Sequence, residues 1–388
     1  MNATQRAQAV RPERAERRPP AGDAGRPGAS GERVSPDSQP DLAKLLNVDE
    51  MEAVAKAKLP IGSYAYVASG AGAEVTMRAN RTAFGRWVFR PRVLVNVKDR
   101  DLSTTVLGTK VSMPVLIAPY ALQCLLDPEG EVATARAAGA AGTVMALSMG
   151  STRTIEDVGA AATGPLWFQP YLFDDLGIVR DAVARAEAAR YASICLTCDS
   201  PALGYREAQT RWPHQLPEGV GWANMPLEGG RPRWLSGASW TWETLDAVRR
   251  TTKLPIVLKG ILTAEDAALA VEHGAAAIVV SNHGGRQLDG SIASLDALPE
   301  IVDAVGGRME VLLDGGIRRG TDVLTALALG ARAVLIGRAA AWGLAVAGQA
   351  GVERVLELLR DELSTSMAIV GARSLADVTR EHVARTAA

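Results

Sequence analysis

Eight short runs of apolar, strand-forming residues recur along the chain, and each is followed by a turn and an alanine-rich stretch with helical spacing. A strand that is apolar along its whole length is buried on both faces, which is typical of a parallel sheet covered by helices. Eight such units predict an α/β fold, the closed (β/α)8 or TIM barrel. The runs occupy residues 115–121, 143–148, 166–171, 193–199, 255–261, 277–283, 310–316 and 333–338.

An open, doubly wound sheet is the alternative architecture for alternating strands and helices. That fold commonly carries a GxGxxG turn after its first strand, and no such turn follows residues 115–121. Polar residues also end most of the runs, as expected where the strand ends of a barrel surround one site. The barrel is therefore the predicted architecture.

One long gap interrupts the regular spacing of the runs. Their starts lie 22 to 33 residues apart, except that 62 residues separate the starts of the fourth and fifth. The extra segment, residues 200–254, is called the insertion below; it holds five of the eight tryptophans and many prolines and glycines. A long irregular segment at a barrel mouth predicts a lid or binding loop. The alternatives are a tryptophan cluster at a subunit contact and a loop that touches a membrane.

The first 40 residues differ in composition from the rest. They are rich in Arg, Pro, Gly and Ser and nearly devoid of large apolar residues, so burial cannot offset the entropy of ordering them. We predict a disordered tail at residues 1–40 and a single domain, the (β/α)8 barrel, at residues 41–388. Because no apolar region typical of a secretory signal is present, the expected location is cytoplasmic.

Charge and cysteine content narrow the class of partner. Lys plus Arg (42) balance Asp plus Glu (43), so the chain lacks the excess of positive charge typical of proteins that bind nucleic acid or anionic membranes. Three cysteines exclude a disulfide framework and suit a reducing compartment. Cys195 and Cys198 lie on a predicted strand, where their side chains face opposite sides and form no redox or metal pair. We expect no metal, and a small molecule or a second copy of the chain as partner.

Polar and titratable residues stand at the carboxyl ends of the predicted strands. In a (β/α)8 barrel these ends converge on one mouth, where catalytic groups are placed. A single polar residue can simply cap its own loop, but titratable groups at most of the eight ends predict a shared active site. The residues are Tyr120, Ser148, Gln169, Tyr171, Thr197, Asp199, Lys259, Asn282, His283, Asp314 and Arg338.

Two glycine-containing turns end the seventh and eighth runs. Gly315 and Gly316 follow one strand, and Gly337 with Arg338 ends the next. Glycine lets backbone N–H groups approach an anion closely, a following helix N-terminus adds positive potential, and an arginine supplies two parallel donors. Because barrels commonly bind phosphate at this position, we predict a phosphorylated cofactor or substrate.

Lys259, Asp199 and His283 point to acid–base chemistry. A buried ammonium at Lys259 needs an anionic partner, and its use is either a Schiff base or a positive charge that stabilises an electron-rich ring. A carboxylate beside an imidazole fixes the tautomer and stabilises the imidazolium, as a general base requires. Arg286, three residues after His283, can hold a substrate carboxylate. The pattern predicts proton transfer on a carboxylate substrate beside a phosphate-anchored cofactor.

Five stretches together resemble the FMN-dependent α-hydroxy acid oxidases and dehydrogenases, the family of glycolate oxidase and lactate oxidase. The resemblance runs from about residue 42 to 385, and its histidine motif is the most specific part. It implies a TIM barrel that binds FMN. The stretches are SNHGGRQLD, LDGGIRRGTDVLTALALGARAVLIGR, PIVLKGI, LTCDSPALGYRE and SYAYVASGAGAE.

The resemblance implies a role for each matching residue. On the substrate side it implies a catalytic base (His283), its carboxylate partner (Asp199), a tyrosine beside the substrate hydroxyl (Tyr171) and ligands of the substrate carboxylate (Tyr66, Arg206 and Arg286). On the cofactor side it implies a lysine at the flavin N1/O2 edge (Lys259), isoalloxazine contacts (Ser148, Gln169 and Thr197), a ribityl contact (Asp314), the phosphate cradle (Gly316, Gly337 and Arg338) and further FMN contacts (Ala121, Ser281, Gly315 and Arg318).

Residues around the substrate depart from the family pattern. APYAL stands where the family typically has APTAM, which places Tyr120 beside the flavin. Gly150 stands where glycolate oxidases have a tryptophan over the substrate. Tyr205 replaces the usual basic residue before Arg206, and Asp127 replaces a usual histidine. We therefore expect a substrate pocket that is widened at Gly150 and narrowed at Tyr120.

The predicted reaction is the FMN-dependent oxidation of a (2S)-hydroxy acid to the 2-oxo acid. We expect O2 as the electron acceptor, because the chain carries no haem domain. The alternatives are a larger substrate such as an aryl hydroxy acid or a biosynthetic intermediate, a dehydrogenase with another acceptor, an FMN-binding protein without turnover, and a Schiff-base aldolase at Lys259. The resemblance also implies a homotetramer, or tetramers stacked as an octamer.

Overall fold

The computed structural model describes residues 40–228, 231–232 and 239–386. The predicted tail at residues 1–40 lies outside these ranges apart from its last residue, and its disorder stays a prediction. The insertion is described except at residues 229–230 and 233–238.

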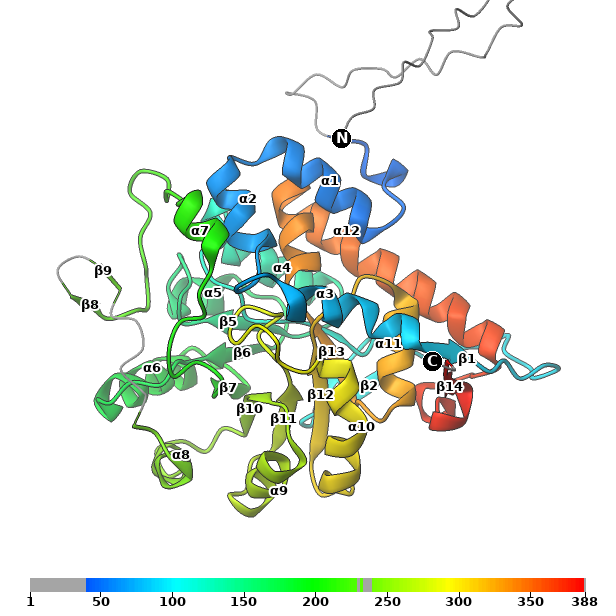
Figure 1. Ribbon diagram of the computed structural model, residues 1–388. Coiled ribbons are helices and arrows are strands. Elements are labelled where there is room, and N and C mark those ends of the chain that lie inside the picture. Colours follow the sequence, from blue (N-terminus) through cyan, green and yellow to red (C-terminus); the bar gives the residue numbers. More distant parts are fainter. Residues whose placement is uncertain (1–39, 229–230, 233–238, 387–388) are drawn as a thin grey trace, which may run out of the picture. The chain divides into compact units, whose positions relative to one another are not determined.

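Eight parallel strands close into a barrel, which confirms the predicted TIM architecture (Figure 1). The strands follow one another around the ring in chain order, and the last pairs with the first to close it. Each begins within one of the eight predicted runs, because strands buried on both faces leave an unmistakable apolar pattern. They are β4 (Val115–Ile117), β5 (Met145–Ser148), β6 (Leu166–Gln169), β7 (Ser193–Thr197), β10 (Ile256–Ile261), β11 (Ala277–Val280), β12 (Glu310–Asp314) and β13 (Ala333–Ile336).

A helix follows each barrel strand and contributes to the layer outside the ring (Figure 1). Side-chain oxygens of Thr154, Asp175 and Thr263 accept backbone N–H groups at the start of three of these helices. The helices are α4 (Glu131–Ala140), α5 (Ile155–Ala161), α6 (Leu176–Ala188), α8 (Trp242–Arg249), α9 (Ala264–Glu272), α10 (Ser294–Val305), α11 (Gly320–Ala328) and α12 (Arg338–Val370).

Side-chain alternation along the strands separates the barrel interior from the layer under the helices. On β4, Leu116 joins the inner cluster, whereas Val115 and Ile117 join the larger cluster beneath the helices. The hairpin of β2 (Thr104–Val106) and β3 (Thr109–Val111) adds a valine from each strand to the inner cluster. In the turn of this hairpin, Leu107 N donates to the carboxylate of Glu310 at the start of β12, so the hairpin covers the amino-terminal end of the barrel and leaves the carboxyl end for a ligand.

Three helices precede the barrel and carry Tyr66 to its mouth. The first of them packs against α12, and the second ends beside the turn that follows β11. A short antiparallel pair, β1 (Trp87–Phe89) with β14 (Val383–Arg385), joins the two ends of the domain. The helices are α1 (Val48–Lys58), α2 (Ile61–Ala68) and α3 (Val75–Thr82), and short 3-10 helices span Leu42–Lys44, Phe84–Arg86, Gln123–Leu125, Leu375–Asp377 and Arg380–His382.

The insertion begins after β7, and its first residues are hydrogen-bonded to the turn after β11. Gln287 Nε2 donates to the carbonyl oxygens of Asp199 (2.8 Å) and Ala202 (3.0 Å), and its Oε1 accepts from Gly204 N. The insertion then forms α7 (Glu207–Arg211), β8 (Leu227–Glu228) and β9 (Arg231–Pro232) before α8. Within the described ranges, no helix has the length and apolarity needed to cross a membrane.

Candidate active site

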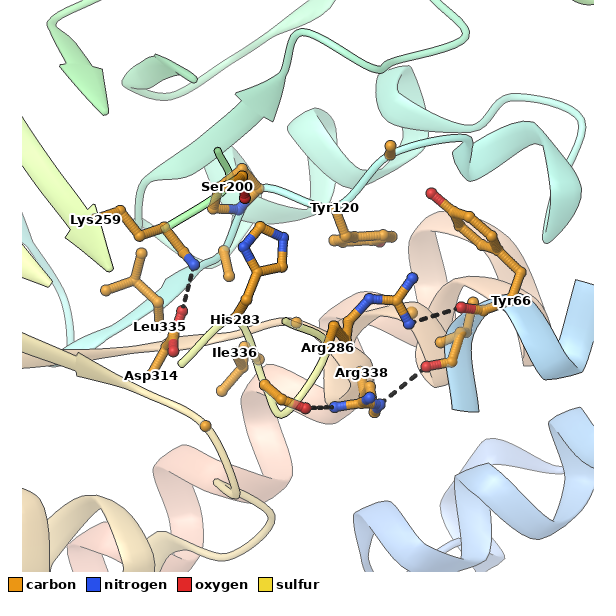
Figure 2. A pocket seen from close by; sticks show the side chains of 18 of the residues that line it. Tyr66, Tyr120, Ser200, Lys259, His283, Arg286, Asp314, Leu335, Ile336 and Arg338 are labelled. Carbon is orange, nitrogen blue, oxygen red and sulfur yellow. Dashed lines mark hydrogen bonds and ion pairs between the residues drawn. The ribbon is translucent and has the colours of Figure 1, made fainter. Parts of the chain in front are cut away.

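A cavity of about 240 Å³ opens at the carboxyl end of the barrel, where the polar strand ends were predicted to meet (Figure 2). Its walls come from the strand ends, from α2 and from the insertion. The structure thus brings together most of the residues that the sequence assigned to a site. Those that line the cavity are Tyr66, Tyr120, Ala121, Tyr171, Arg206, Lys259, His283, Arg286, Asp314, Gly315, Gly316, Arg318, Gly337 and Arg338.

Seven predicted site residues do not line this cavity and lie behind its wall; one of them, Asn282, supports the turn that carries His283. Asp199 reaches it through His283, and Ser281 through Lys259. The remaining four are buried at or just after strand ends; for three of them contact with FMN stays a prediction, and for Gly150 contact with the substrate does. They are Ser148, Gly150, Gln169 and Thr197.

His283 is paired with a carboxylate as predicted. Its Nδ1 lies 3.0 Å from Asp199 Oδ1, and the two side chains are 18% and 12% exposed. Burial lowers the pKa of His283 below its ordinary value, although Asp199 opposes this shift. Burial raises the pKa of Asp199, but the facing His283 reverses the shift, so the net pKa is lowered. With the Nδ1 proton donated to Asp199, Nε2 is left as an acceptor for a substrate proton.

The backbone after β11 turns sharply to present His283. His283 itself has a left-handed φ of +59°, followed by Gly284 (+64°) and Gly285 (+74°). A Cβ at Gly285 would come within 2.6 Å of backbone atoms of Met77 on α3, so this glycine permits a close approach as well as the positive φ. Ser281 Oγ accepts from His283 N at 3.1 Å and steadies the turn.

A reciprocal amide pair supports the same turn from α3. Asn80 Nδ2 donates to Asn282 Oδ1 (2.7 Å), and Asn282 Nδ2 donates to Asn80 Oδ1 (2.8 Å). Asn282 Oδ1 also accepts from Gly285 N at 3.0 Å. Both side chains are buried, with their polar groups satisfied by each other and by the backbone. Asn80 was not predicted as a site residue, because its partner lies 202 positions away in the chain.

Lys259 forms a buried ion pair at the base of the cavity (Figure 2). Its Nζ lies 3.0 Å from Asp314 Oδ2 and donates to Ser281 Oγ at 2.9 Å. Burial would lower the pKa of Lys259, but Asp314 and Asp199 raise it above its ordinary value. A Schiff base requires a neutral amine, so this environment favours the fixed positive charge over the aldolase alternative.

Three partly buried arginines make the cavity strongly positive. Arg286 Nη1 donates to the carbonyl oxygens of Tyr66 and Ser69 at the end of α2, and Arg338 donates to Val67 O and Gly284 O (Figure 2). Burial and the neighbouring arginines Arg206 and Arg338 lower the pKa of Arg286 to about 9. Burial likewise lowers the pKa of Arg338 and Arg318 to about 10, with each next to another arginine. This excess of cations favours the binding of anions.

The insertion supplies cavity residues that the sequence did not single out. Leu203, Gln209, His214 and Trp222 all line the cavity. The ring of His214 packs against that of Tyr66 at a centroid distance of 4.8 Å. The only sequence signal for these residues was the length and composition of the insertion, which predicted a binding loop without naming its contacts.

Residues 55–385 match the family model of the FMN-dependent dehydrogenases. The chain belongs to this family. It is 51% identical over 355 residues to an L-lactate oxidase from Nostoc sp., covering 87% of this chain and 97% of the relative. It is 48% identical over 354 residues to glycolate oxidase from Spinacia oleracea, covering 88% and 96%.

Solved structures of this FMN-dependent family share the fold of the chain. A mandelate oxidase variant bound to 2-hydroxy-phenylacetamide superimposes with a TM-score of 0.83 at 42% identity, covering 89% of this chain and 100% of that one. A chimera of (S)-mandelate dehydrogenase gives a TM-score of 0.84 at 36% identity, covering 88% and 100%. The family resemblance noted in the sequence is therefore confirmed.

FMN is the cofactor of this family, and the cavity fits it. Asp314 Oδ1 is buried and has no partner among the described residues, which leaves an acceptor for a ribityl hydroxyl. A Cβ at Gly337 would meet only Ala118, at 3.9 Å, so the start of α12 is open to an anion. The N-terminus of α12, together with Arg318 and the Gly315–Gly316 turn, supplies the positive potential that a phosphate requires. Across the described ranges, no cluster of His, Cys, Asp and Glu is arranged to hold a metal ion.

Proposed function

We propose that the protein oxidises (2S)-2-hydroxy acids to 2-oxo acids, with O2 as the final electron acceptor. The observation that supports this most strongly is the joint placement of a carboxylate-paired histidine and an arginine cluster in one FMN cavity. The names of the relatives agree with it, since L-lactate oxidase and glycolate oxidase act on acids of this class.

Each side chain has a defined task in the proposed reaction. Arg286 and Arg206 hold the substrate carboxylate, with Tyr66 beside them. His283 Nε2 accepts the proton of the substrate hydroxyl or α-carbon, and Asp199 stabilises the imidazolium that results. FMN, when bound, supplies the capacity to take up two electrons. Tyr171 lies beside the substrate hydroxyl, and its high pKa, raised by burial, keeps it as a neutral hydrogen-bond donor.

Removal of His283 tests the proposal. The FMN-loaded protein should lose its 450-nm absorbance when it is mixed anaerobically with a 2-hydroxy acid. His283→Ala should stay yellow yet bleach at least about 10²-fold more slowly, since a general base contributes that much to proton transfer. Bleaching at the wild-type rate in His283→Ala would contradict the assignment of the base. If none of the 2-hydroxy acids tested bleaches the wild-type protein, the proposed function itself is contradicted.

The acceptor is tested separately from the substrate. Rapid O2 consumption with a bleaching acid would support an oxidase. Slow reoxidation by O2 together with fast reoxidation by an artificial dye would favour the dehydrogenase alternative. The identities of 48% and 51% to named oxidases support the first outcome.

Assembly and location remain part of the proposal. The family resemblance supports a homotetramer or a stacked octamer, and light scattering of the purified protein measures this directly. We also propose a cytoplasmic location, which cell fractionation tests.

A further inference from the structure

The wall of the cavity beside Gly150 is made by a tryptophan from the insertion. A Cβ placed on Gly150 would lie 3.3 Å from Trp222 Cζ3 and 2.9 Å from Ala121 Cβ. Gly150 is buried and does not line the cavity, whereas Trp222 and Ala121 do. The widening that the sequence predicted at Gly150 is therefore offset by an indole that arrives from another part of the chain.

The backbone next to Trp222 is fastened to the loop that follows β5. Ala223 N donates to Ser151 O at 3.0 Å. Asn224, which is 6% exposed, donates through Nδ2 to Ser151 Oγ (2.7 Å) and Arg153 O (2.8 Å). Its Oδ1 accepts from Ile155 N at 3.1 Å. The Asn224 amide is thus satisfied by this loop, by the start of α5 and by Arg185 of α6, whose Nη2 donates to Asn224 Oδ1 at 2.8 Å. These bonds hold the backbone beside Trp222 next to Gly150.

The side chains around Trp222 are suited to an apolar substituent. Tyr120 and Ala121 lie on the same cavity wall, and Leu203 also lines the cavity. The hydroxyl of Tyr120 lies 3.3 Å from Thr134 Oγ1 on α4, so its polar end already has a partner on the barrel and its ring faces the cavity (Figure 2). Arg286 lies in the turn after β11, apart from these apolar residues, whereas Arg206 shares the insertion with Trp222 and Leu203.

We infer that Trp222 determines which 2-hydroxy acid side chains the pocket accepts, and that Asn224 is the residue that positions it. This inference rests on the proposed function, because it concerns the substrate of that reaction. Trp222 limits the length and width of the side chain at C2, while Gly150 provides the space in which the indole packs.

The test measures anaerobic bleaching by L-lactate and by (S)-mandelate. For each acid, the bleaching rate constant is divided by the dissociation constant, and the mandelate-to-lactate ratio compares these two quotients. Trp222→Ala should raise the mandelate-to-lactate ratio by about tenfold or more, since a change of one or a few carbons in a pocket alters discrimination by that factor. Trp222→Phe should give a smaller increase. A ratio within about twofold of wild type in both variants would overturn the inference.

Trp212→Ala is the matched control. Trp212 belongs to the same insertion, is 41% exposed and is absent from the cavity wall. The mandelate-to-lactate ratio of Trp212→Ala should stay within about twofold of wild type. An equal shift in Trp212→Ala and Trp222→Ala would mean that any disturbance of the insertion changes the ratio, and would overturn the specific role of Trp222.

A double-mutant cycle tests Asn224 as a positioning residue. Asn224→Ala should raise the ratio in the same direction as Trp222→Ala, and this effect should vanish in the Trp222→Ala background. If Asn224 were only structural, its replacement would lower the free energy of unfolding and leave the ratio unchanged, which would overturn its assignment.

Failure of the proposed function has a different signature. If none of the 2-hydroxy acids bleaches the wild-type protein, the affinities for pyruvate and phenylglyoxylate can still be measured from the flavin difference spectrum. These two affinities report which side chains the pocket accepts. A selective gain in phenylglyoxylate affinity in Trp222→Ala would support the inference. Unchanged relative affinity, or no binding of either oxo acid, would overturn it.

Discussion

His283 Nδ1 lies 3.0 Å from Asp199 Oδ1 although the two residues follow β11 and β7, which do not pair with each other. The strand between them is β10, and it carries Lys259. The base and its carboxylate therefore bridge across the strand that supplies the buried cation. A closed ring of parallel strands makes this arrangement possible, because neighbouring strand ends lie about 5 Å apart.

Asp199→Asn should slow anaerobic bleaching by about 10²-fold while FMN stays bound. The amide cannot stabilise the imidazolium, and it no longer selects the tautomer that leaves Nε2 free. Stopped-flow absorbance at 450 nm measures the rate. Asp181→Asn on α6, an exposed aspartate, is the control and should bleach at the wild-type rate. Wild-type bleaching in Asp199→Asn would show that His283 works without its partner.

The pH dependence of bleaching should report the protonation of His283. Burial lowers the pKa of His283 below its ordinary value of 6.5, so the base stays neutral at pH 7 and gains its proton only in more acidic solution. The bleaching rate constant divided by the dissociation constant should fall about tenfold per pH unit below that pKa. In Asp199→Asn the midpoint should move to still lower pH, because Asp199 raises the pKa of His283. A wild-type midpoint above 6.5 would contradict this assignment.

Lys259→Met should destabilise the fold because it leaves the carboxylate of Asp314 without its cation. The Asp314 side chain is only 8% exposed, so its carboxylate would be left buried without its cation. Removal of one member of such a pair costs about 3–5 kcal/mol. Urea unfolding at a fixed excess of FMN measures this loss in the free energy of unfolding. The double variant Lys259→Met/Asp314→Asn removes both charges and should lose less than the single variant; equal losses would show that the ion pair does not explain the effect.

Gly285→Ala should be far more damaging than Gly307→Ala, although the two glycines have nearly equal φ values of +74° and +76°. A left-handed alanine costs about 1–2 kcal/mol at either site. At Gly285 the new Cβ also meets Met77 N and Cα, whereas at Gly307 nothing lies within 4 Å. We expect Gly285→Ala to lose at least about 2 kcal/mol more in the free energy of unfolding. Equal losses would mean that the turn and α3 are not tightly packed.

The barrel and the strand-end residues were predictable because both are local features of the sequence. An apolar run ends at a definite residue, and the side chain at that end must face the mouth of the barrel, as His283, Lys259 and Asp314 do. The pairing of β1 with β14 was not predictable, because each strand has only three residues and they lie at opposite ends of the domain.

The residues missed at the site depend on contacts between distant segments. Asn80 acts through Asn282, and Trp222 is placed by bonds from Asn224 to the loop after β5. No periodicity marks such residues, since an irregular insertion takes its path from the surface on which it lies. The substitution at Gly150 was visible in the sequence, but the indole that compensates for it was not.

The insertion adds no strand to the ring of eight, yet it contributes Leu203, His214 and Trp222 to the cavity. The barrel that carries the acid–base pair and the residues proposed to select the substrate side chain therefore belong to separate parts of the molecule. In evolutionary terms, this segment can change in length or composition while the ring and its acid–base pair are inherited intact. For protein engineering, exchange of the part of the insertion that follows Arg206 offers a route to a new acid preference without redesign of the barrel.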